Sequence, residues 1–307
     1  MKHPLLIVLL GPTASGKTTL AAHIAHRIGG EIISADSRQV YRDLNIGTGK
    51  DLDEYQVEGK PIPYHLIDIC DPGEEYNLSR YQEDFEGAFS KVVGQGKKPI
   101  LCGGSGLYLE AVLEQYQLTS VPEDLLLRKE VSLYTNDELV ERIKSYQFPE
   151  YFTPDLSTRK RLVRSIEIGE YLSRKGSIPD PTQPMFNPVI FGVKLSREIR
   201  RKKITNRLRH RLDNGLIEEV QGLIKNGIST ERLRYFGLEY KFVTDYLEGE
   251  LSQDQLFEKL KIAIHQFAKR QMTWFRRMER RGHDIHWIDG QLPLDIKVNE
   301  IVDKLCG

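Results

Sequence analysis

The residues with the clearest chemical signature lie at Gly11–Thr18, in the segment GPTASGKT. This segment matches G-x-x-x-x-G-K-[ST] and stands between an apolar run and a helical pattern, as that motif requires. In such a loop the backbone N–H groups and the helix start surround phosphate oxygens, the lysine adds charge, and Thr18 can ligate Mg²⁺. The sequence therefore predicts a polyphosphate site, for ATP or another polyphosphate, built from Gly11, Pro12, Thr13, Ala14, Ser15, Gly16, Lys17 and Thr18.

A single carboxylate, Asp36, stands between two serines in EIISADSRQVY. It ends an apolar run that follows shortly after the phosphate-binding segment. In a small-molecule kinase such a residue would be a metal ligand or a contact to the acceptor. In an ordinary loop it would cap the next turn, and local pattern alone favours this cap.

A second glycine turn, GGSGLYL at 103–109, also leaves an apolar run and enters a helical pattern. If this turn lies beside the phosphate-binding segment at one edge of a sheet, Ser105 can donate a hydrogen bond to a phosphate oxygen there. A purely structural connection explains the turn equally well. No lid arginines, adenine site or Walker-B acid accompany these turns, since Asp68 in HLIDI is as readily a turn residue.

Basic residues form three clusters, although Lys and Arg (44) balance Asp and Glu (44). The clusters lie at 157–168, 196–212 and 265–281, and the last interleaves basic residues with Phe267, Trp274 and Phe275. Basic stripes with aromatic residues suit contacts to the backbone and bases of single-stranded RNA loops. Solvated helix faces are the alternative explanation of each cluster.

Bulk composition excludes several classes of protein. The 307 residues are 39% hydrophobic and 29% charged, which is typical of a soluble globular chain. The three cysteines are odd in number and lack a CxxC pair, so neither a disulfide framework nor a zinc site is indicated. Apolar runs are too short to span a membrane. We expect a cytoplasmic protein without a membrane partner.

The order of elements predicts an α/β fold. Strand patterns at 5–10, 31–35, 64–69, 98–104 and 189–195 alternate with helical patterns at 17–28, at 79–95 and from 107. Continuous apolar strands separated by helices indicate a parallel sheet covered by helices, as in a P-loop NTPase-like core. We assign residues 1–117 and 189–307 to this core, which ends in long basic helices, and 118–188 to a small all-helical insertion domain.

Six segments together closely resemble the tRNA dimethylallyltransferase family, also called tRNA isopentenyltransferases. In chain order they are GPTASGKT, SADSRQVY, IGTGK, GGSGLY, NRLRHRLDNGLIEEV and AKRQMTWFR. The family transfers the dimethylallyl group of dimethylallyl diphosphate to N6 of the adenosine immediately 3′ of certain tRNA anticodons. The resemblance implies a P-loop-type core, Mg²⁺ as cofactor, and an insertion that clamps the tRNA anticodon stem-loop.

The resemblance also assigns residues. Asp36 matches the catalytic base, Ser105 stands where most members have threonine, and Arg207 in ITNRL matches an arginine placed against the diphosphate. The predicted tRNA contacts are Asp36, Ser37, Arg38, Gln39, Ser105, Arg128, Lys160, Arg161, Leu162, Val163, Arg164, Lys269, Arg270, Gln271, Trp274 and Arg276. The usual QAIGYKE turn appears here as RYFGLEYKF at 234–242.

Three other functions stay open on the residues alone. An ATP-dependent small-molecule kinase needs only the phosphate-binding segment. An isopentenyltransferase acting on free adenine nucleotides would share the core but have little use for the basic clusters. A nucleotide-switched RNA-binding protein would not need Asp36 between two glycine turns. We also expect a monomer, because no exposed apolar helix face stands out.

Overall fold

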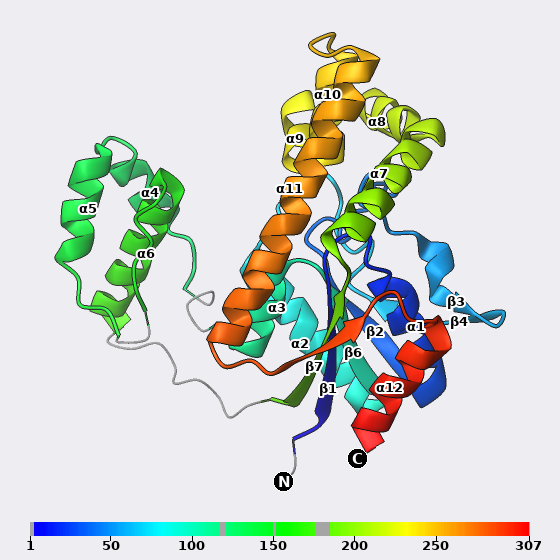
Figure 1. The fold of residues 1–307 in the computed structure, drawn as a ribbon. Helices are drawn as coiled ribbons and strands as arrows, with labels where there is room; N and C mark the ends of the chain where they lie inside the picture. The colour runs from blue at the N-terminus through cyan, green and yellow to red at the C-terminus, as the bar shows by residue number, and fades with distance from the viewer. Residues whose placement is uncertain (1–2, 117–120, 150–151, 176–184, 307) are drawn as a thin grey trace. The chain divides into compact units, whose positions relative to one another are not determined.

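The computed structural model describes residues 3–116, 121–149, 152–175 and 185–306. The chain forms two compact units: Met1–Glu114 with Met185–Gly307, and Gln115–Pro184 (Figure 1). We call them the core unit and the insertion unit. The boundary predicted at 117 and 118 lies outside the described residues.

A six-stranded sheet organises the core unit, and all of its strand pairs are parallel. The strand order is β5-β2-β6-β1-β7-β8. The strands are β1 (Leu5–Leu10), β2 (Gly30–Ala35), β5 (Tyr64–His65), β6 (Lys98–Gly103), β7 (Asn187–Lys194) and β8 (Ile285–Asp289). The predicted α/β class with a parallel sheet is therefore confirmed. A 3₁₀ turn, Leu52–Tyr55, and a small antiparallel pair, β3 (Gln56–Val57) and β4 (Lys60–Pro61), lie outside this sheet.

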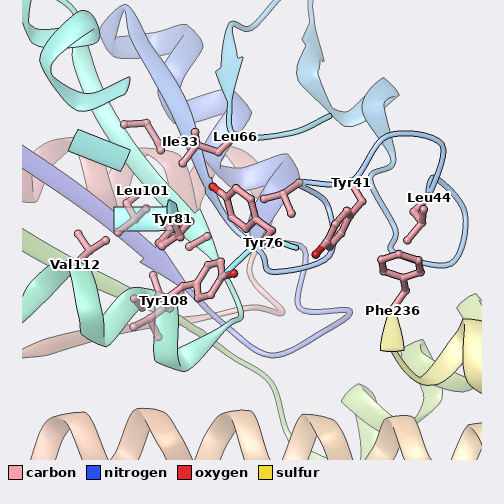
Figure 2. Packing of buried hydrophobic residues seen from close by; sticks show 14 of the residues in the cluster. Ile33, Tyr41, Leu44, Leu66, Tyr76, Tyr81, Leu101, Tyr108, Val112 and Phe236 are labelled. Carbon is pink, nitrogen blue, oxygen red and sulfur yellow. The ribbon is translucent and has the colours of Figure 1, made fainter. Parts of the chain in front are cut away.

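Alternation along the strands divides the core into two layers. In β1, Leu6, Val8 and Leu10 belong to one apolar cluster, whereas Ile7 and Leu9 belong to the other. The first cluster includes residues of α2 (Leu78–Gly94) and α3 (Gly106–Leu113), and the second includes residues of α1 (Lys17–Ile28) and α12 (Leu294–Cys306). Figure 2 shows the aromatic part of the first cluster, where the rings of Tyr81 and Tyr108 stack at 3.9 Å between centroids.

Two strand predictions need correction. The strand predicted at 64–69 is only the two-residue β5, because Leu66 (φ 62°) and Asp68 (φ 57°) adopt left-handed backbone conformations that end it. Asp68 pairs with the buried Lys50, so it is a structural residue of this turn. The basic C-terminal region also holds β8, which was predicted as helix; its Ile285 and Ile288 are buried beside β7.

Five further helices belong to the core unit: α7 (Arg197–Asp213), α8 (Leu216–Lys225), α9 (Thr230–Tyr235), α10 (Leu238–Leu247) and α11 (Gln253–Arg280). Three helices begin at a serine whose side chain accepts a hydrogen bond from a first-turn N–H group: Ser196 for α7, Ser229 for α9 and Ser252 for α11. These caps fix where the helices begin. In Figure 1, α7 to α10 extend beyond the carboxyl edge of the sheet, and α11 runs from them to α3.

The insertion unit has its own apolar core. Its helices are α4 (Leu125–Val131), α5 (Asn136–Lys144) and α6 (Arg159–Lys175). They bury one cluster of Leu127, Val131, Leu139, Ile143, Leu162 and Ile166. Thr135 and Glu138 form a capping box that starts α5. In the described part of both units, no helix is long and apolar enough to cross a membrane.

Candidate functional site

The phosphate-binding loop connects β1 to α1 at the carboxyl edge of the sheet. Gly16 has φ 80° and Ala14 has φ 61°, so the backbone curls back on itself before the helix begins at Lys17. A side chain at Gly16 would meet no atom within 4 Å, so its left-handed conformation, and not crowding, is what requires glycine. The curled backbone and the helix start form the anion-binding arrangement that the sequence predicts.

Thr13 in this loop is held from two helices. Its backbone N–H donates to Gln271 Oε1 of α11 at 2.9 Å, and its hydroxyl accepts from Arg207 Nη2 of α7. Arg207 therefore contacts the phosphate-binding loop directly. Ser15 Oγ is buried and has no hydrogen-bond partner among the described residues.

Asp36 immediately follows β2 and caps the next turn. Its Oδ1 accepts from the N–H of Arg38 at 2.9 Å and of Gln39 at 3.4 Å. The cap favoured by local pattern is thus present. Its Oδ2 accepts no hydrogen bond from the part of the chain that the structure describes, so one carboxylate oxygen remains available to a ligand. Capping and catalysis are compatible, because the cap fixes the carboxylate in place.

Ser105 begins α3 and contacts the same turn. Its Oγ accepts from the N–H of Ser37 at 3.2 Å, and its own N–H donates to the carbonyl of Ala35 at 3.3 Å. This close approach needs Gly103, because a Cβ there would lie 2.2 Å from the Ala35 oxygen. The bond to Ser37 uses an oxygen lone pair and leaves the O–H hydrogen for a ligand.

Arg207 lies in a mixed cluster of charges. Burial, reinforced by nearby Arg211, lowers the pKa of Arg207 to about 10, and Glu239, Asp51 and Glu54 oppose that shift. At neutral pH the guanidinium is still charged. Burial also raises the pKa of Glu239, and so does the charge of Asp36. Glu239 was missed from the sequence, where the only signal was an acid in the unusual RYFGLEYKF turn.

The other residues predicted on the 36–39 turn are close to Asp36. Arg38 lies with its guanidinium carbon 4.7 Å from the ring centroid of Tyr235, which is 47% exposed. The Gln39 amide donates to Gly49 O at 2.9 Å and is 3.3 Å from Ser34 Oγ, so it already has partners inside the core unit.

In α11 the predicted tRNA residues separate into two groups. Lys269, Arg270 and Arg276 are exposed, as an RNA contact requires. Gln271 is only 7% exposed and bonds to Thr13 and Gly104. Trp274 is half-buried, and its ring packs so closely on Gly106 that a Cβ there would lie 2.5 Å away.

The predicted tRNA residues of the insertion unit are mostly engaged within it. Leu162 is 2% exposed and belongs to the apolar core, because its position on α6 turns its side chain inward. Val163 is half-buried against the same core. Arg128 and Arg164 pair with Glu167, and Arg161 pairs with Asp155. Lys160 is exposed.

No group of three or more His, Cys, Asp or Glu side chains among the described residues is arranged to hold a metal ion. Mg²⁺ usually takes few protein ligands and completes its shell with substrate phosphates and water. The Thr18 hydroxyl in the first turn of α1, beside the anion-binding loop, fits such a site.

A phosphate-binding loop, a capped carboxylate and a glycine turn at one sheet edge define a P-loop-type group-transfer protein. The model of the family IPP transferase matches residues 39–278, and the model Isopentenyl transferase matches residues 4–60. The chain belongs to the IPP transferase family.

Similar proteins carry consistent names. A tRNA dimethylallyltransferase 2 of Bacteroides fragilis is 51% identical over 98% of this chain and 97% of its own length. A tRNA dimethylallyltransferase 1 of Parabacteroides distasonis is 52% identical over 97% of this chain and 96% of its own. The solved tRNA isopentenylpyrophosphate transferase of Bacillus halodurans has a TM-score of 0.72 at 30% identity, covering 100% of this chain and 96% of that one.

Proposed function

We propose that this protein transfers the dimethylallyl group of dimethylallyl diphosphate to N6 of the adenosine immediately 3′ of the anticodon in tRNA, releasing diphosphate. The observation that carries the proposal is the contact between the two glycine turns and the Asp36 turn at one edge of the sheet. One carboxylate beside an anion-binding loop suits a reaction in which the acceptor attacks an electrophile carrying a diphosphate and loses its proton to that carboxylate. Family membership supports this identity of donor and acceptor.

Asp36 is the base in this scheme. The adenine N6 amine is a weak nucleophile because its lone pair is delocalised into the ring. The free oxygen of Asp36 accepts one amine hydrogen, which restores electron density on nitrogen as the new C–N bond forms, and then keeps the proton. A positioned base of this kind contributes about 10²–10⁴-fold. The cap to Arg38 and Gln39 holds this carboxylate still.

The diphosphate leaves as the C–O bond to the allylic carbon breaks, and negative charge grows on its oxygens. Lys17, Arg207, the loop N–H groups and the Ser105 hydroxyl stabilise that charge where it develops. Thr18 would hold Mg²⁺, which adds further positive charge to the diphosphate when bound. The allylic carbon can bear partial positive charge, so the site must exclude water if hydrolysis is to be avoided.

The target adenosine is out of reach inside a stacked anticodon loop and must be flipped toward Asp36. Lys269, Arg270 and Arg276 on α11 are exposed, which supports a role for them in phosphate contacts that hold the RNA during flipping. The insertion unit would clamp the anticodon stem-loop through contacts from its own basic residues. Because the core unit alone supplies Asp36, Lys17, Ser105 and Arg207, we propose a monomer, working in the cytoplasm.

One experiment distinguishes this function from its rivals. The protein is incubated with labelled dimethylallyl diphosphate and Mg²⁺ together with tRNA, with AMP, or with ATP, and the labelled acceptor is identified. We expect label only in tRNA, at the adenosine that follows the anticodon. Label in AMP or ATP would instead establish an enzyme acting on free nucleotides, and failure to label any acceptor would refute prenyl transfer.

A further inference from the structure

Gln271 connects the two glycine turns of the site through opposite ends of one side-chain amide. Its Oε1 accepts from the N–H of Thr13 at 2.9 Å, and its Nε2 donates to the carbonyl of Gly104 at 2.8 Å. The side chain is 7% exposed. We propose that Gln271 is a positioning residue that fixes the spacing between the phosphate-binding loop and the Ser105 turn. This inference rests on the prenyl transfer proposed above.

The neutral amide can make both bonds, which an ionised carboxylate cannot. The Thr13 N–H needs an acceptor and the Gly104 carbonyl needs a donor, and a neutral carboxamide offers one of each. An ionised carboxylate can accept from the Thr13 N–H but cannot donate to the Gly104 carbonyl. A thioether is only a weak acceptor for the Thr13 N–H and has no hydrogen to donate to the Gly104 carbonyl. The two partners therefore specify the orientation of the amide, and an unmade bond here would leave a buried backbone group unsatisfied.

The glycines of the second turn are shaped for this contact. A Cβ at Gly104 would lie 2.5 Å from Gln271 Nε2 and 3.2 Å from the carbonyl of Gly11. The same helix face packs Trp274 against Gly106. These glycines thus admit α11, which explains the glycine-rich GGSG turn without requiring that all of it face a phosphate.

A continuous set of contacts then extends from the donor site to the base. Thr13 bonds to Gln271, Gln271 to Gly104, and the next residue, Ser105, to the N–H of Ser37 beside Asp36. Separation of the two turns would move the leaving group relative to Asp36. Because near-attack geometry is sensitive to displacements of about 1 Å, this change reduces the rate of transfer by about 10²-fold at most.

This assignment differs from the tRNA contact that the family resemblance predicts for Gln271. Both polar atoms of the amide are occupied by backbone groups of the core unit, and the side chain is buried. The exposed neighbours Lys269 and Arg270 remain available to RNA. Gln271 variants should therefore impair donor binding and transfer while leaving tRNA affinity unchanged.

The first test is Gln271→Met, with Gln253→Met as the matched control because Gln253 is an exposed glutamine at the start of the same helix. Three quantities are measured: the dissociation constant of dimethylallyl diphosphate without tRNA, that of tRNA, and the single-turnover rate. We expect Gln271→Met to slow single turnover by about 10–100-fold and to weaken diphosphate binding, with tRNA affinity within about twofold of wild type. A loss of tRNA affinity alone would overturn the inference.

A second test remains informative if Gln271→Met folds poorly. Gln271→Glu keeps the shape, and its protonated form can again both accept and donate. Burial raises the pKa of such a carboxyl, so the bond to Gly104 should return as pH falls from about 8 to about 6. We expect the single-turnover rate of Gln271→Glu, divided by that of wild type, to rise about tenfold over this interval.

The control for charge is Gln253→Glu, whose rate ratio should stay constant over the same pH interval. A constant ratio for Gln271→Glu as well, or normal transfer in both Gln271 variants, would overturn the positioning role. Wild-type transfer to tRNA is measured first, so a failure of the proposed function appears there and is not confused with a failure of this inference.

Discussion

Clustered basic residues occur in both units, but their surroundings differ. In the insertion unit, Arg128 and Arg164 both pair with Glu167, whose side chain is fully buried. In the core unit, Arg200 of α7 lies near Arg276 and Arg197. Burial, and then the charges of these two arginines, lower the pKa of Arg200. Among the described residues, none of these three arginines has a carboxylate within ion-pair distance.

The difference indicates two uses of the same residue type. Arginines that neutralise a buried carboxylate contribute to the stability of their own unit. Arginines that repel one another cost stability, and an anion such as an RNA phosphate would relieve that cost. Composition and spacing along the chain do not distinguish the two cases, since both segments read as basic helices.

Within this comparison, the largest expected effect tests the paired cluster. Glu167→Gln removes the charge that holds Arg128 and Arg164, so we expect the insertion unit to lose about 1–3 kcal/mol of its free energy of unfolding. Hydrogen exchange of α4 and α6 measures this loss. Glu141→Gln is the control, because Glu141 pairs with Lys144 on the surface. Equal effects of the two substitutions would contradict the structural role of Glu167.

The same carboxylate predicts a pH dependence. Burial opposes ionisation of Glu167, yet hydrogen bonds from Arg128, Arg164 and the Asp124 N–H hold its pKa below the ordinary value of 4.5. An acid with a lowered pKa in the folded state stabilises it above the unfolded-state pKa, and this stability is lost as pH falls through the folded-state value. Wild type and Glu167→Gln should therefore differ near neutral pH and converge in acid. A difference in stability that does not change with pH would show that the charge of Glu167 is not what stabilises the insertion unit.

The next effect tests the repelling cluster. Replacing Arg200 and Arg276 by alanine should weaken tRNA binding by about 10–100-fold and reduce the slope of log affinity against log salt by about 1.4–1.8. The melting temperature should not fall, because like charges are removed. Lys259→Ala, at an exposed position of α11 outside the cluster, should leave the slope unchanged. An unaltered slope in the double variant would show that these arginines do not meet RNA phosphates.

The smallest effect is expected in the insertion unit. Arg161 already pairs with Asp155 and would exchange that partner for a phosphate, so Lys160→Ala with Arg161→Ala should weaken tRNA binding by only about 2–5-fold. Filter binding over a salt series compares it with the Arg200 and Arg276 variant. A reversal of this order would contradict the distinction between the two clusters.

Much of the fold follows from short-range pattern. The first strand, the phosphate-binding loop and α1 are specified by an apolar run, a glycine with φ 80° and a helical pattern in immediate succession. β8 was missed because only its Ile285 and Ile288 are buried, while His286, the partly buried Trp287 and the exposed Asp289 break up the apolar run. The early end of β5 depends on the left-handed backbone conformations of Leu66 and Asp68, which the apolar sequence does not predict.

The site was predictable in its motifs and not in its long-range contacts. Asp36, Ser105 and Lys17 could be placed at one edge because carboxyl ends of parallel strands meet there. The inward orientation of Gln271 depends on hydrogen bonds to turns that lie 258 and 167 residues away in the sequence. The inward orientation of Leu162 depends on which face of α6 packs against the apolar core of the insertion unit. Such orientations are set by tertiary packing, which no local pattern contains.

The most direct test of the central claim is the single-turnover rate of Asp36→Asn with tRNA already bound and labelled dimethylallyl diphosphate in excess. Asparagine keeps an oxygen that can cap the turn but cannot take the amine proton. We predict a rate about 10²–10⁴-fold below wild type, with both dissociation constants within about threefold. A near-normal rate in this variant would contradict the assignment of Asp36 as the base.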